Sequence, residues 1–276
     1  MEETIELLYN EVKSKKQIKD LDNEFVKKHI IKYLKSNGDM RKKIENSKNK
    51  TTKNPIIKTA IKDIRNEIGQ LYGCYLTSKY QKRYRFLEEN KIEELLLSHK
   101  SSRERYNFYN EFYNIILNWH KPKSIVDIAC GFNPFSYPIL EKKHKKIKYL
   151  TIDLDNDDTN LINNFFEKNK LNGKAKTYDI TDKKFLQDKD LKNYETAFLL
   201  KTLDSVERTN KNLSKEILED LPQKKIVVTF PSQSLVSKKN VKNNARKWFI
   251  KFLDEKKWNY IKTSIENEDI YLITKN

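Results

Sequence analysis

The stretch SIVDIACGFNP, residues 124–134, decides the fold of this chain. Its first six residues are mostly apolar and suit a buried strand, and the next ones include Gly131 and Pro134, which suit a turn. A strand ending in small residues lets a ligand approach the backbone, and ligands of open α/β sheets lie outside the carboxyl ends of the strands. We therefore expect a ligand-binding turn. Because Ala129 stands where a first glycine is usual, an ordinary strand-to-helix turn is the alternative.

Short β-rich runs separated by helical stretches follow this turn. The runs are 149–154, 175–180, 196–203, 225–230, 259–265 and 270–274. Alternating strands and helices imply parallel βαβ units in a doubly wound sheet. Only residues 266–269 separate the last two runs, so these two strands must be antiparallel. We expect an α/β fold with a seven-stranded, mostly parallel sheet, which resembles the layout of class I (Rossmann-like) S-adenosylmethionine-dependent methyltransferases.

Composition narrows the class of protein. The 276 residues carry a formal net charge of +17. No apolar run approaches the ~18–20 residues that span a bilayer, and the acidic start is unlike a secretory signal. Two cysteines, Cys74 and Cys130, exclude a disulfide scaffold and an all-cysteine zinc site. We expect a cytoplasmic protein with a polyanionic partner, nucleic acid first, without a membrane or metal partner; the sequence leaves the oligomeric state open.

The part of the chain before the predicted sheet is basic, and its sequence pattern predicts helices. Residues 1–105 hold 25 Lys and Arg against 16 Asp and Glu, more than half of the chain's excess positive charge. Isoleucines from Ile57 to Ile68 recur at the three-and-four spacing of a buried helix stripe, after a capping Asn54. We expect a helical, basic RNA-binding domain over residues 1–105 and a methyltransferase domain over residues 106–276.

Acidic residues end the second and third predicted strands. Asp153 lies about twenty positions beyond the glycine turn, where a carboxylate accepts hydrogen bonds from both hydroxyls of a ribose, and Asp155 is an alternative just beyond the strand. Asp179 suits an adenine amino group. Acids at two consecutive strand ends favour a nucleoside cofactor. The missing third glycine and the terminal hairpin disfavour NAD and FAD.

Four motifs, in this order along the chain, resemble one family. ACGFNP at 129–134 is similar to the glycine-turn-Asn-Pro motif of the 16S ribosomal RNA guanine-N7 methyltransferases associated with aminoglycoside resistance. HKSSRER at 99–105 resembles that family's His-x-Ser-Thr-Arg-Glu-Arg stretch. LLKTL at 199–203 and FPSQSL at 230–235 resemble its Leu-Lys-x-Leu and Phe-Pro-Thr-Arg-Ser-Leu segments.

The resemblance implies roles for individual residues. S-adenosylmethionine would be the cofactor, and an arginine of the 99–105 stretch would pair with its carboxylate. The implied cofactor-binding residues are Ser101, Ser102, Arg103, Arg105, Ala129, Gly131, Asp153 and Asp179. Lys201 would be the catalytic residue, beside the methyl group and the target base.

RNA contacts are predicted in two places. In YQKRYRF at 80–86, basic and aromatic residues interleave, which suits phosphates and unpaired bases, although a plain amphipathic helix has the same pattern. The loop after the fifth strand is expected to face RNA, with glutamine where the family has arginine. The candidate RNA-binding residues are Lys82, Arg83, Arg85, Gln233, Lys238 and Lys239. We interpret the basic run at 142–146 as a solvated turn.

The implied reaction agrees with the motifs. Guanine N7 carries an in-plane lone pair, so methyl transfer to it needs alignment and charge stabilisation but no general base. No Asn-Pro-Pro-Tyr motif follows the fourth strand, and the chain has no Pro-Cys pair. The resemblance implies methylation of guanine N7 in structured RNA, small-subunit ribosomal RNA first. Two alternatives stay open: a transfer RNA guanine-N7 methyltransferase with an archaeal-type housekeeping role, and a non-catalytic S-adenosylmethionine- and RNA-binding protein.

Overall fold

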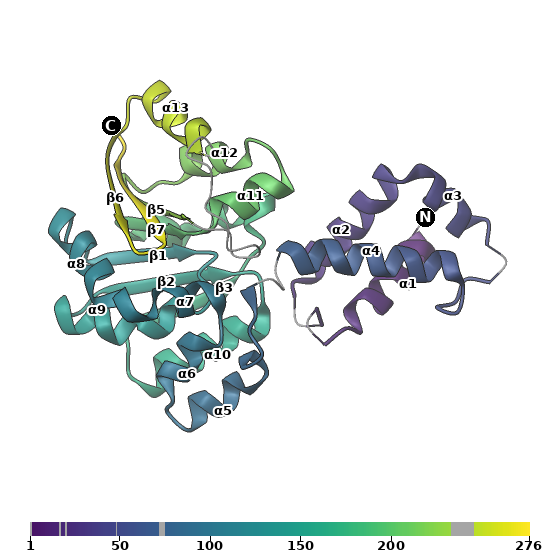
Figure 1. The fold of residues 1–276 in the computed structure, drawn as a ribbon, viewed down its shortest axis with the longest axis horizontal. Coiled ribbons are helices and arrows are strands. Elements are labelled where there is room, and N and C mark those ends of the chain that lie inside the picture. Colours follow the sequence, from purple (N-terminus) through teal and green to yellow (C-terminus); the bar gives the residue numbers. More distant parts are fainter. Residues whose placement is uncertain (1, 17, 20, 48, 72–74, 233–245) are drawn as a thin grey trace. The chain divides into compact units, whose positions relative to one another are not determined.

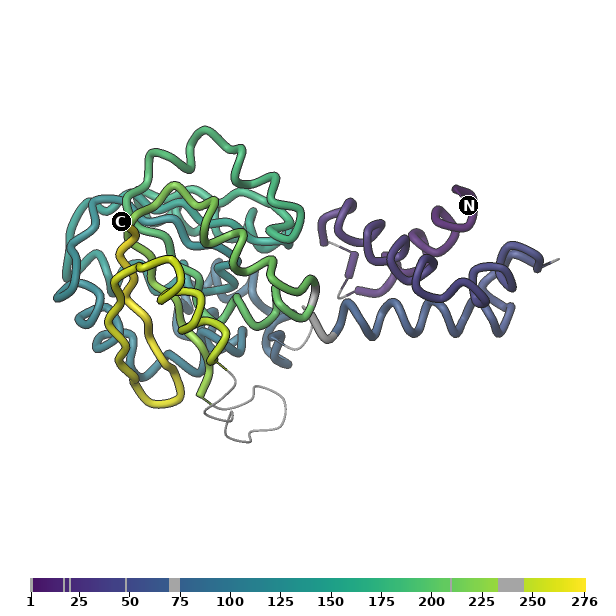
Figure 2. The backbone as a smooth tube through the Cα atoms, turned by 90° about the horizontal axis from the view of Figure 1, so that it is seen from above, coloured from purple at the N-terminus to yellow at the C-terminus, as the bar shows by residue number. Residues whose placement is uncertain are grey.

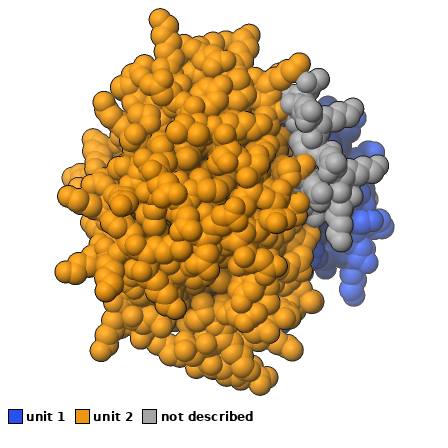
Figure 3. All heavy atoms as spheres, turned by 60° about the vertical axis from the view of Figure 1, so that its left-hand side comes forward, with its two compact units in different colours: residues 1–74, 155–157 blue, residues 75–154, 158–276 orange. Residues whose placement is uncertain are grey.

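The chain forms two compact units, which Figure 3 colours separately. The computed structural model describes residues 2–16, 18–19, 21–47, 49–71, 75–232 and 246–276. The helical unit contains residues 1–74 with 155–157, and the sheet unit contains 75–154 with 158–276. Within the described ranges, no helix is both long and apolar enough to cross a membrane.

The helical unit is built from helices that bury one apolar stripe each. Its described helices are α1 (Glu2–Lys13), α2 (Asn23–Ser36), α3 (Gly38–Glu45) and α4 (Pro55–Leu71), labelled in Figure 1. At the start of α4, the Asn54 side-chain oxygen accepts the backbone N–H of Ile56 (2.9 Å), which confirms the predicted cap. Ile57, Ile64 and Ile68 are buried, and α4 packs on α1 and α2. The predicted isoleucine stripe is therefore the core side of α4.

The sheet unit is organised around a seven-stranded sheet with the order β3-β2-β1-β4-β5-β7-β6 (Figure 1). The strands are β1 (Ser124–Ile128), β2 (Lys148–Asp153), β3 (Gly173–Thr177), β4 (Thr196–Leu200), β5 (Lys225–Pro231), β6 (Asn259–Ile265) and β7 (Glu268–Thr274). β1 to β5 are parallel, whereas β7 is antiparallel to β5 and β6. The β6–β7 hairpin is yellow in Figure 2. The predicted fold class and closing hairpin are confirmed.

Apolar clusters lie on both faces of the sheet. Ile125 and Tyr149 belong to one cluster, and their chain neighbours Val126 and Leu150 belong to the other. Because both faces are covered, β1 and β4 are buried at every position, which explains their nearly continuous apolar sequences. The flanking helices are α8 (Tyr109–Trp119), α9 (Tyr137–Lys143), α10 (Asn156–Lys168), α11 (Leu203–Thr209), α12 (Leu213–Asp220) and α13 (Lys247–Glu255).

The division between the units falls between residues 74 and 75 rather than at the expected boundary of 105. The sheet unit also includes α5 (Arg83–Glu88), α6 (Ile92–Leu97) and α7 (Lys100–Arg105). Phe86 and Leu95 lie in the same apolar cluster as Phe132, which follows β1. Helical periodicity records which face of a helix is buried but not what covers it, so the sequence pattern did not locate this boundary. RNA binding by the N-terminal helices stays a prediction.

A buried ion pair joins α5 to α10. The Arg83 Nε donates to Asp158 Oδ1 (2.8 Å), the Tyr80 hydroxyl donates to the same oxygen (2.9 Å), and the guanidinium carbon lies 4.1 Å from the Tyr80 ring centroid. The Arg83 and Asp158 side chains are 8% and 5% exposed. The Arg83 guanidinium is therefore buried and is not exposed for the predicted RNA contact. Lys82 and Arg85, by contrast, are exposed.

Removing one partner of this pair is expected to destabilise the sheet unit. Asp158→Ala takes the carboxylate from a buried guanidinium and should lower the free energy of unfolding by about 3 kcal/mol. The control is Glu89→Ala, which removes the partner of the exposed Arg85 and should leave the urea midpoint nearly unchanged. Equal midpoint shifts for the two variants in urea unfolding would contradict this account.

Candidate active site

Three residues with left-handed backbones follow β1 and β4 at the carboxyl edge of the sheet. Ala129 has φ +54°, Gly131 has φ +50° and Lys201 has φ +59°. β1 and β4 are neighbours, so both turns lie at one sheet edge. A left-handed backbone costs roughly 1–2 kcal/mol for a residue other than glycine, and such strain concentrates at functional sites. Ala129 thus has a left-handed backbone, which glycine adopts without this cost, at a position where glycine is usual.

Asp153, at the end of β2, is tied to the glycine turn. Its Oδ2 accepts the backbone N–H of Gly131 (2.7 Å) and its Oδ1 accepts that of Leu154 (2.8 Å). Asp179, after β3, accepts hydrogen bonds from the backbone N–H (2.8 Å) and hydroxyl (2.6 Å) of Thr181. Both acids are nearly buried. The structure thus holds the two predicted nucleoside-binding carboxylates at the ends of adjacent strands.

The 99–105 stretch lies directly on the glycine turn. A Cβ added to Gly131 would come within 2.7 Å of His99 Cε1, so a glycine is required there. The His99 ring stacks on Tyr75 with centroids 5.7 Å apart. Burial, assisted by the charge of Arg105, lowers the pKa of His99 to about 3, so the imidazole is neutral. Ser101 Oγ lies 3.0 Å from His99 Nδ1, whereas the Ser102 hydroxyl donates to the backbone carbonyl of Leu96 (2.7 Å).

Arg105 and Lys201 share one buried carboxylate, Glu268, at the start of β7. Arg105 Nε donates to Glu268 (3.1 Å), and a second guanidinium nitrogen also bonds to it. Lys201 Nζ lies 3.4 Å from Glu268 and donates to Glu104 (2.8 Å). The Arg105, Lys201 and Glu268 side chains are at most 1% exposed. Burial opposes ionisation of Glu268, but the two cations hold its pKa below the ordinary value.

Arg105 and Arg103 therefore have different surroundings. Besides Glu268, the Arg105 guanidinium donates to the side-chain oxygen of Asn133 (3.2 Å), which occupies it with protein acceptors. Arg103 is exposed and forms no ion pair with any carboxylate in the described ranges. Of the two arginines predicted to bind the cofactor carboxylate, Arg103 is the one with a guanidinium available for it.

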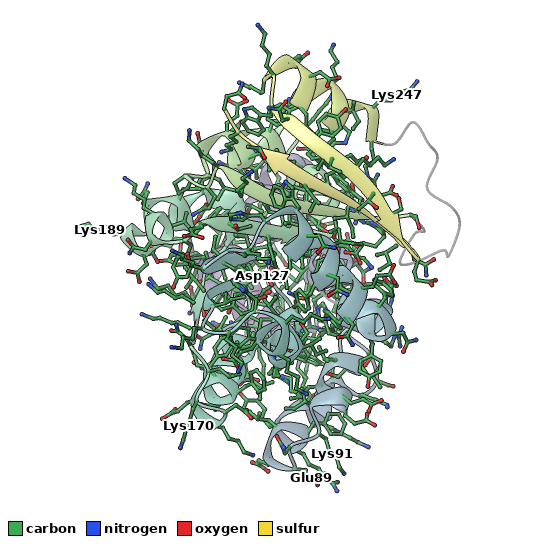
Figure 4. All side chains as sticks on the ribbon, turned by 90° about the vertical axis from the view of Figure 1, so that its left-hand side faces the viewer. Glu89, Lys91, Asp127, Lys170, Lys189 and Lys247 are labelled. Carbon is green, nitrogen blue, oxygen red and sulfur yellow. The ribbon has the colours of Figure 1, made fainter. Side chains whose placement is uncertain are left out.

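Asp127, labelled in Figure 4, is a second buried acidic residue of this site and lies inside β1. Its Oδ2 accepts hydrogen bonds from the Asn133 amide (2.7 Å) and the Tyr149 hydroxyl (2.6 Å), while Oδ1 has no hydrogen-bond partner among the described residues. Burial raises the pKa of Asp127 to about 6, against the opposing effect of these two hydrogen bonds. Asp127 thus fixes the amide of Asn133, which in turn accepts from Arg105.

Sequence reasoning missed Asp127, Glu104 and Glu268 as members of this network. Asp127 carried a usable signal, since it is the one acid in an apolar strand. Glu268 carried none, because it stands in the polar segment 266–269 between two strands. Of the predicted RNA contacts, Gln233, Lys238 and Lys239 lie outside the described residues.

The sheet order, the left-handed turn after β1, and the acids at the end of β2 and after β3 agree with the predicted fold of the class I methyltransferases. Residues 89–273 match the family described as Ribosomal RNA methyltransferase (FmrO). The chain belongs to this ribosomal RNA methyltransferase family.

Individual relatives agree with this assignment. A 16S rRNA (guanine(1405)-N(7))-methyltransferase of Micromonospora rosea is 27% identical over 179 residues, which cover 64% of this chain and 63% of the relative, less than two thirds of its length. A protein of the same name from Frankia casuarinae is 22% identical over 230 residues, covering 78% and 79%. The structure titled 16S rRNA methyltransferase RmtF in complex with S-adenosyl-L-homocysteine has a TM-score of 0.76 at 21% identity over all of both chains, which supports the fold.

Gly131 is expected to tolerate no side chain. In Gly131→Ala the methyl group would press on His99 while the backbone stays left-handed, so we expect a loss of about 1–3 kcal/mol of stability and at least tenfold weaker S-adenosylmethionine binding. Gly69→Ala in α4 is the control, because a Cβ there meets no atom within 4 Å. Calorimetric titration and thermal unfolding of both variants provide the measurement, and unchanged affinity in Gly131→Ala would contradict the proposed turn.

Asp127 should make stability depend on pH. Its folded pKa of about 6 lies above the ordinary 3.8, so the folded state binds the proton more tightly than the unfolded state. The resulting stabilisation is present at pH 4 and is lost as pH rises towards 6.5, by up to roughly 3 kcal/mol. The stability of the wild type relative to Asp127→Asn should therefore fall across this window in urea unfolding. A pH-independent difference would exclude the buried, titrating carboxyl.

Proposed function

We propose that this protein transfers the methyl group of S-adenosylmethionine to N7 of a guanine in small-subunit ribosomal RNA. Family membership gives the substrate class, and the names of the relatives support the 16S molecule and the N7 position. The observation that carries the proposal is Lys201, a cation held at the carboxyl edge beside the cofactor turn by two carboxylates. Ribosomal RNA as substrate supports action in the cytoplasm.

The described residues fit the cofactor. Gly131 lets a ligand approach the backbone, Asp153 and Asp179 offer carboxylates for the ribose and the adenine, and the exposed Arg103 offers a guanidinium for the methionine carboxylate. When bound, the cofactor supplies a methyl group on a positively charged sulfur. Glu268 compensates the charge of the neighbouring Arg105. Arg105 therefore supports the turn after β1 through its hydrogen bond to Asn133 and does not bind the cofactor itself.

Lys201 and Glu104 suit a guanine base. The partly exposed Glu104 carboxylate can accept from the N1–H of guanine, and the Lys201 ammonium, buried behind this carboxylate, has a third N–H that it can donate to the neighbouring O6 where the base displaces part of its cover. Adenine has a donor, its amino group, in place of O6 and an acceptor, its unprotonated N1, in place of the N1–H. Lys201 and Glu104 therefore favour guanine. With the base aligned, its N7 lone pair would take up the methyl group that the cofactor supplies, and no proton would have to leave N7. Because the rate then depends on alignment and charge stabilisation, the buried network contributes by fixing the Lys201 position.

The alternatives predict different products. We propose ribosomal rather than transfer RNA because both relatives described above carry the name of a 16S enzyme. The test is incubation with labelled S-adenosylmethionine and, separately, transfer RNA, naked 16S RNA and small ribosomal subunits, followed by nucleoside analysis. We expect 7-methylguanosine in 16S RNA, free or assembled. Label in transfer RNA alone would establish the transfer RNA alternative, and cofactor binding without label in any RNA would establish the non-catalytic one.

Lys201 is expected to act on turnover rather than on cofactor binding. Lys201→Met keeps much of the side-chain stem but removes the cation, and should lower kcat by about 100-fold, as for loss of one charge-stabilising donor. The affinity for S-adenosylmethionine, measured by calorimetry, should stay within a few-fold. Lys183→Met is the control, because Lys183 pairs with Asp220 and Glu216 at the surface. Normal turnover in Lys201→Met would show that Lys201 merely covers the sheet edge.

A further inference from the structure

We propose that the sheet unit has a second RNA-binding surface, at the edge of the sheet opposite the active site. This surface, which we call the amino-edge cluster, consists of Lys121, Lys123, Lys142, Lys143, Lys145, Lys146 and Lys148. All seven side chains are exposed. The partner that fits them is the phosphate backbone of a second RNA segment, and that part of the inference rests on the proposed function.

The fold brings these lysines together from two places in the chain. Lys121 and Lys123 precede β1, while the run 142–146 ends α9 and leads into β2 at Lys148. β1 and β2 are paired, with Ser124 opposite Lys148, and the Lys148 N–H donates to the Lys123 carbonyl (2.9 Å). The cluster thus spans the amino ends of two adjacent strands, on the side where α8 and α9 lie in Figure 1, which faces the reader in Figure 4. The four lysines of the run are exposed, as expected, and the fold places Lys121, Lys123 and Lys148 beside them.

The cluster differs from other lysines in its lack of carboxylate partners. No lysine of the cluster forms an ion pair with a carboxylate in the parts of the chain that the structure describes. Lys143 donates to the Asn114 side chain (2.8 Å), and the Lys148 ammonium lies 4.8 Å from the Tyr194 ring centroid. Elsewhere, by contrast, many exposed lysines are paired, such as Lys79 with Glu94 and Lys91 with Glu89.

The surrounding residues do not neutralise the cluster. Glu195 lies beside it, with a carboxylate that accepts the backbone N–H of Lys123 (2.8 Å), and Glu141 of α9 is half-buried; these two negative charges stand against the seven lysines and leave a net positive charge. The pKa of the nearby His120 is lowered, first by burial and then by Lys225, so this imidazole is neutral and does not change the charge of the cluster. Uncompensated like charges repel one another and destabilise the compact state. A bound polyanion would relieve that repulsion.

The chemistry of the cluster favours phosphates over other partners. Among the described residues, the exposed large hydrophobic side chains are Tyr84 and Ile261, and both lie outside the cluster. The cluster therefore lacks the apolar anchors of a protein interface or a membrane-inserting surface. Ammonium groups on flexible stems bind phosphate as point charges, which positions a nucleic acid without reading its sequence.

The position of the cluster restricts the size of the RNA. β2 has six residues, so at ~3.3 Å per residue its two ends lie roughly 20 Å apart. RNA that contacts the amino edge therefore lies about this far from the guanine at the carboxyl edge. A folded ribosomal RNA can reach both edges, whereas a hairpin too short to span this distance reaches the carboxyl edge alone.

The test is RNA binding without cofactor at several salt concentrations. One variant combines Lys142→Gln, Lys143→Gln, Lys145→Gln and Lys146→Gln. The charge-matched control combines Lys79→Gln, Lys91→Gln, Lys183→Gln and Lys256→Gln, four lysines that are each paired with a carboxylate. For 16S RNA, the cluster variant should bind at least tenfold more weakly at 0.1 M salt, and the slope of log affinity against log salt should shrink by roughly 3. The control should keep most of its slope.

Three further measurements make the outcome unambiguous. The Lys121→Gln, Lys123→Gln double variant probes the β1 side of the same surface and should lose about half as much slope, and unchanged S-adenosylmethionine affinity reports that each variant is folded. Binding of a short hairpin with the target guanine should be unchanged in the cluster variant. Equal losses in the cluster variant and the control would overturn the proposal. If the wild type methylated no RNA but the slopes still differed, the proposed function would fail while the binding surface stood.

Discussion

The candidate active site depends on one buried carboxylate that compensates two buried cations. Glu268 contacts Arg105 and Lys201, which come from distant parts of the chain, and all three side chains are almost inaccessible to water. A buried charge without a partner is strongly destabilising, so these three residues can only be buried together. Their pairing requires that β7 and the turn after β4 lie beside α7. The C-terminal hairpin therefore completes the site as well as the sheet.

A second carboxylate extends this constraint to the glycine turn. Asp127 holds the Asn133 amide, whose oxygen accepts from Arg105, so the turn after β1 is connected to the same cations. The left-handed conformations of Ala129 and Lys201 are strained states that need such support. Side chains fixed before substrate arrives cost no reorganisation during a reaction, so the proposed site could accelerate methyl transfer without a general base.

The parallel sheet separates two kinds of surface. Its carboxyl edge collects the turns, strained residues and paired charges of the candidate active site. Its amino edge collects exposed lysines, Lys123 and Lys148 among them, without carboxylate partners in the described chain. The proposed chemistry at one edge and the proposed sequence-independent attraction at the other would suit an enzyme that acts on a large folded polyanion.

The sequence by itself determined the α/β class, the closing hairpin, the family and the adjacent positions of Gly131 and Asp153. These follow from local periodicity, short connections and motif spacing, which neighbouring residues carry. The tertiary structure decided that Arg83 is buried against Asp158, that α5 to α7 join the sheet unit, and that Arg105 pairs with Glu268. Such pairings join side chains up to 163 positions apart, and the burial that gives each charge its role exists only after those segments pack together.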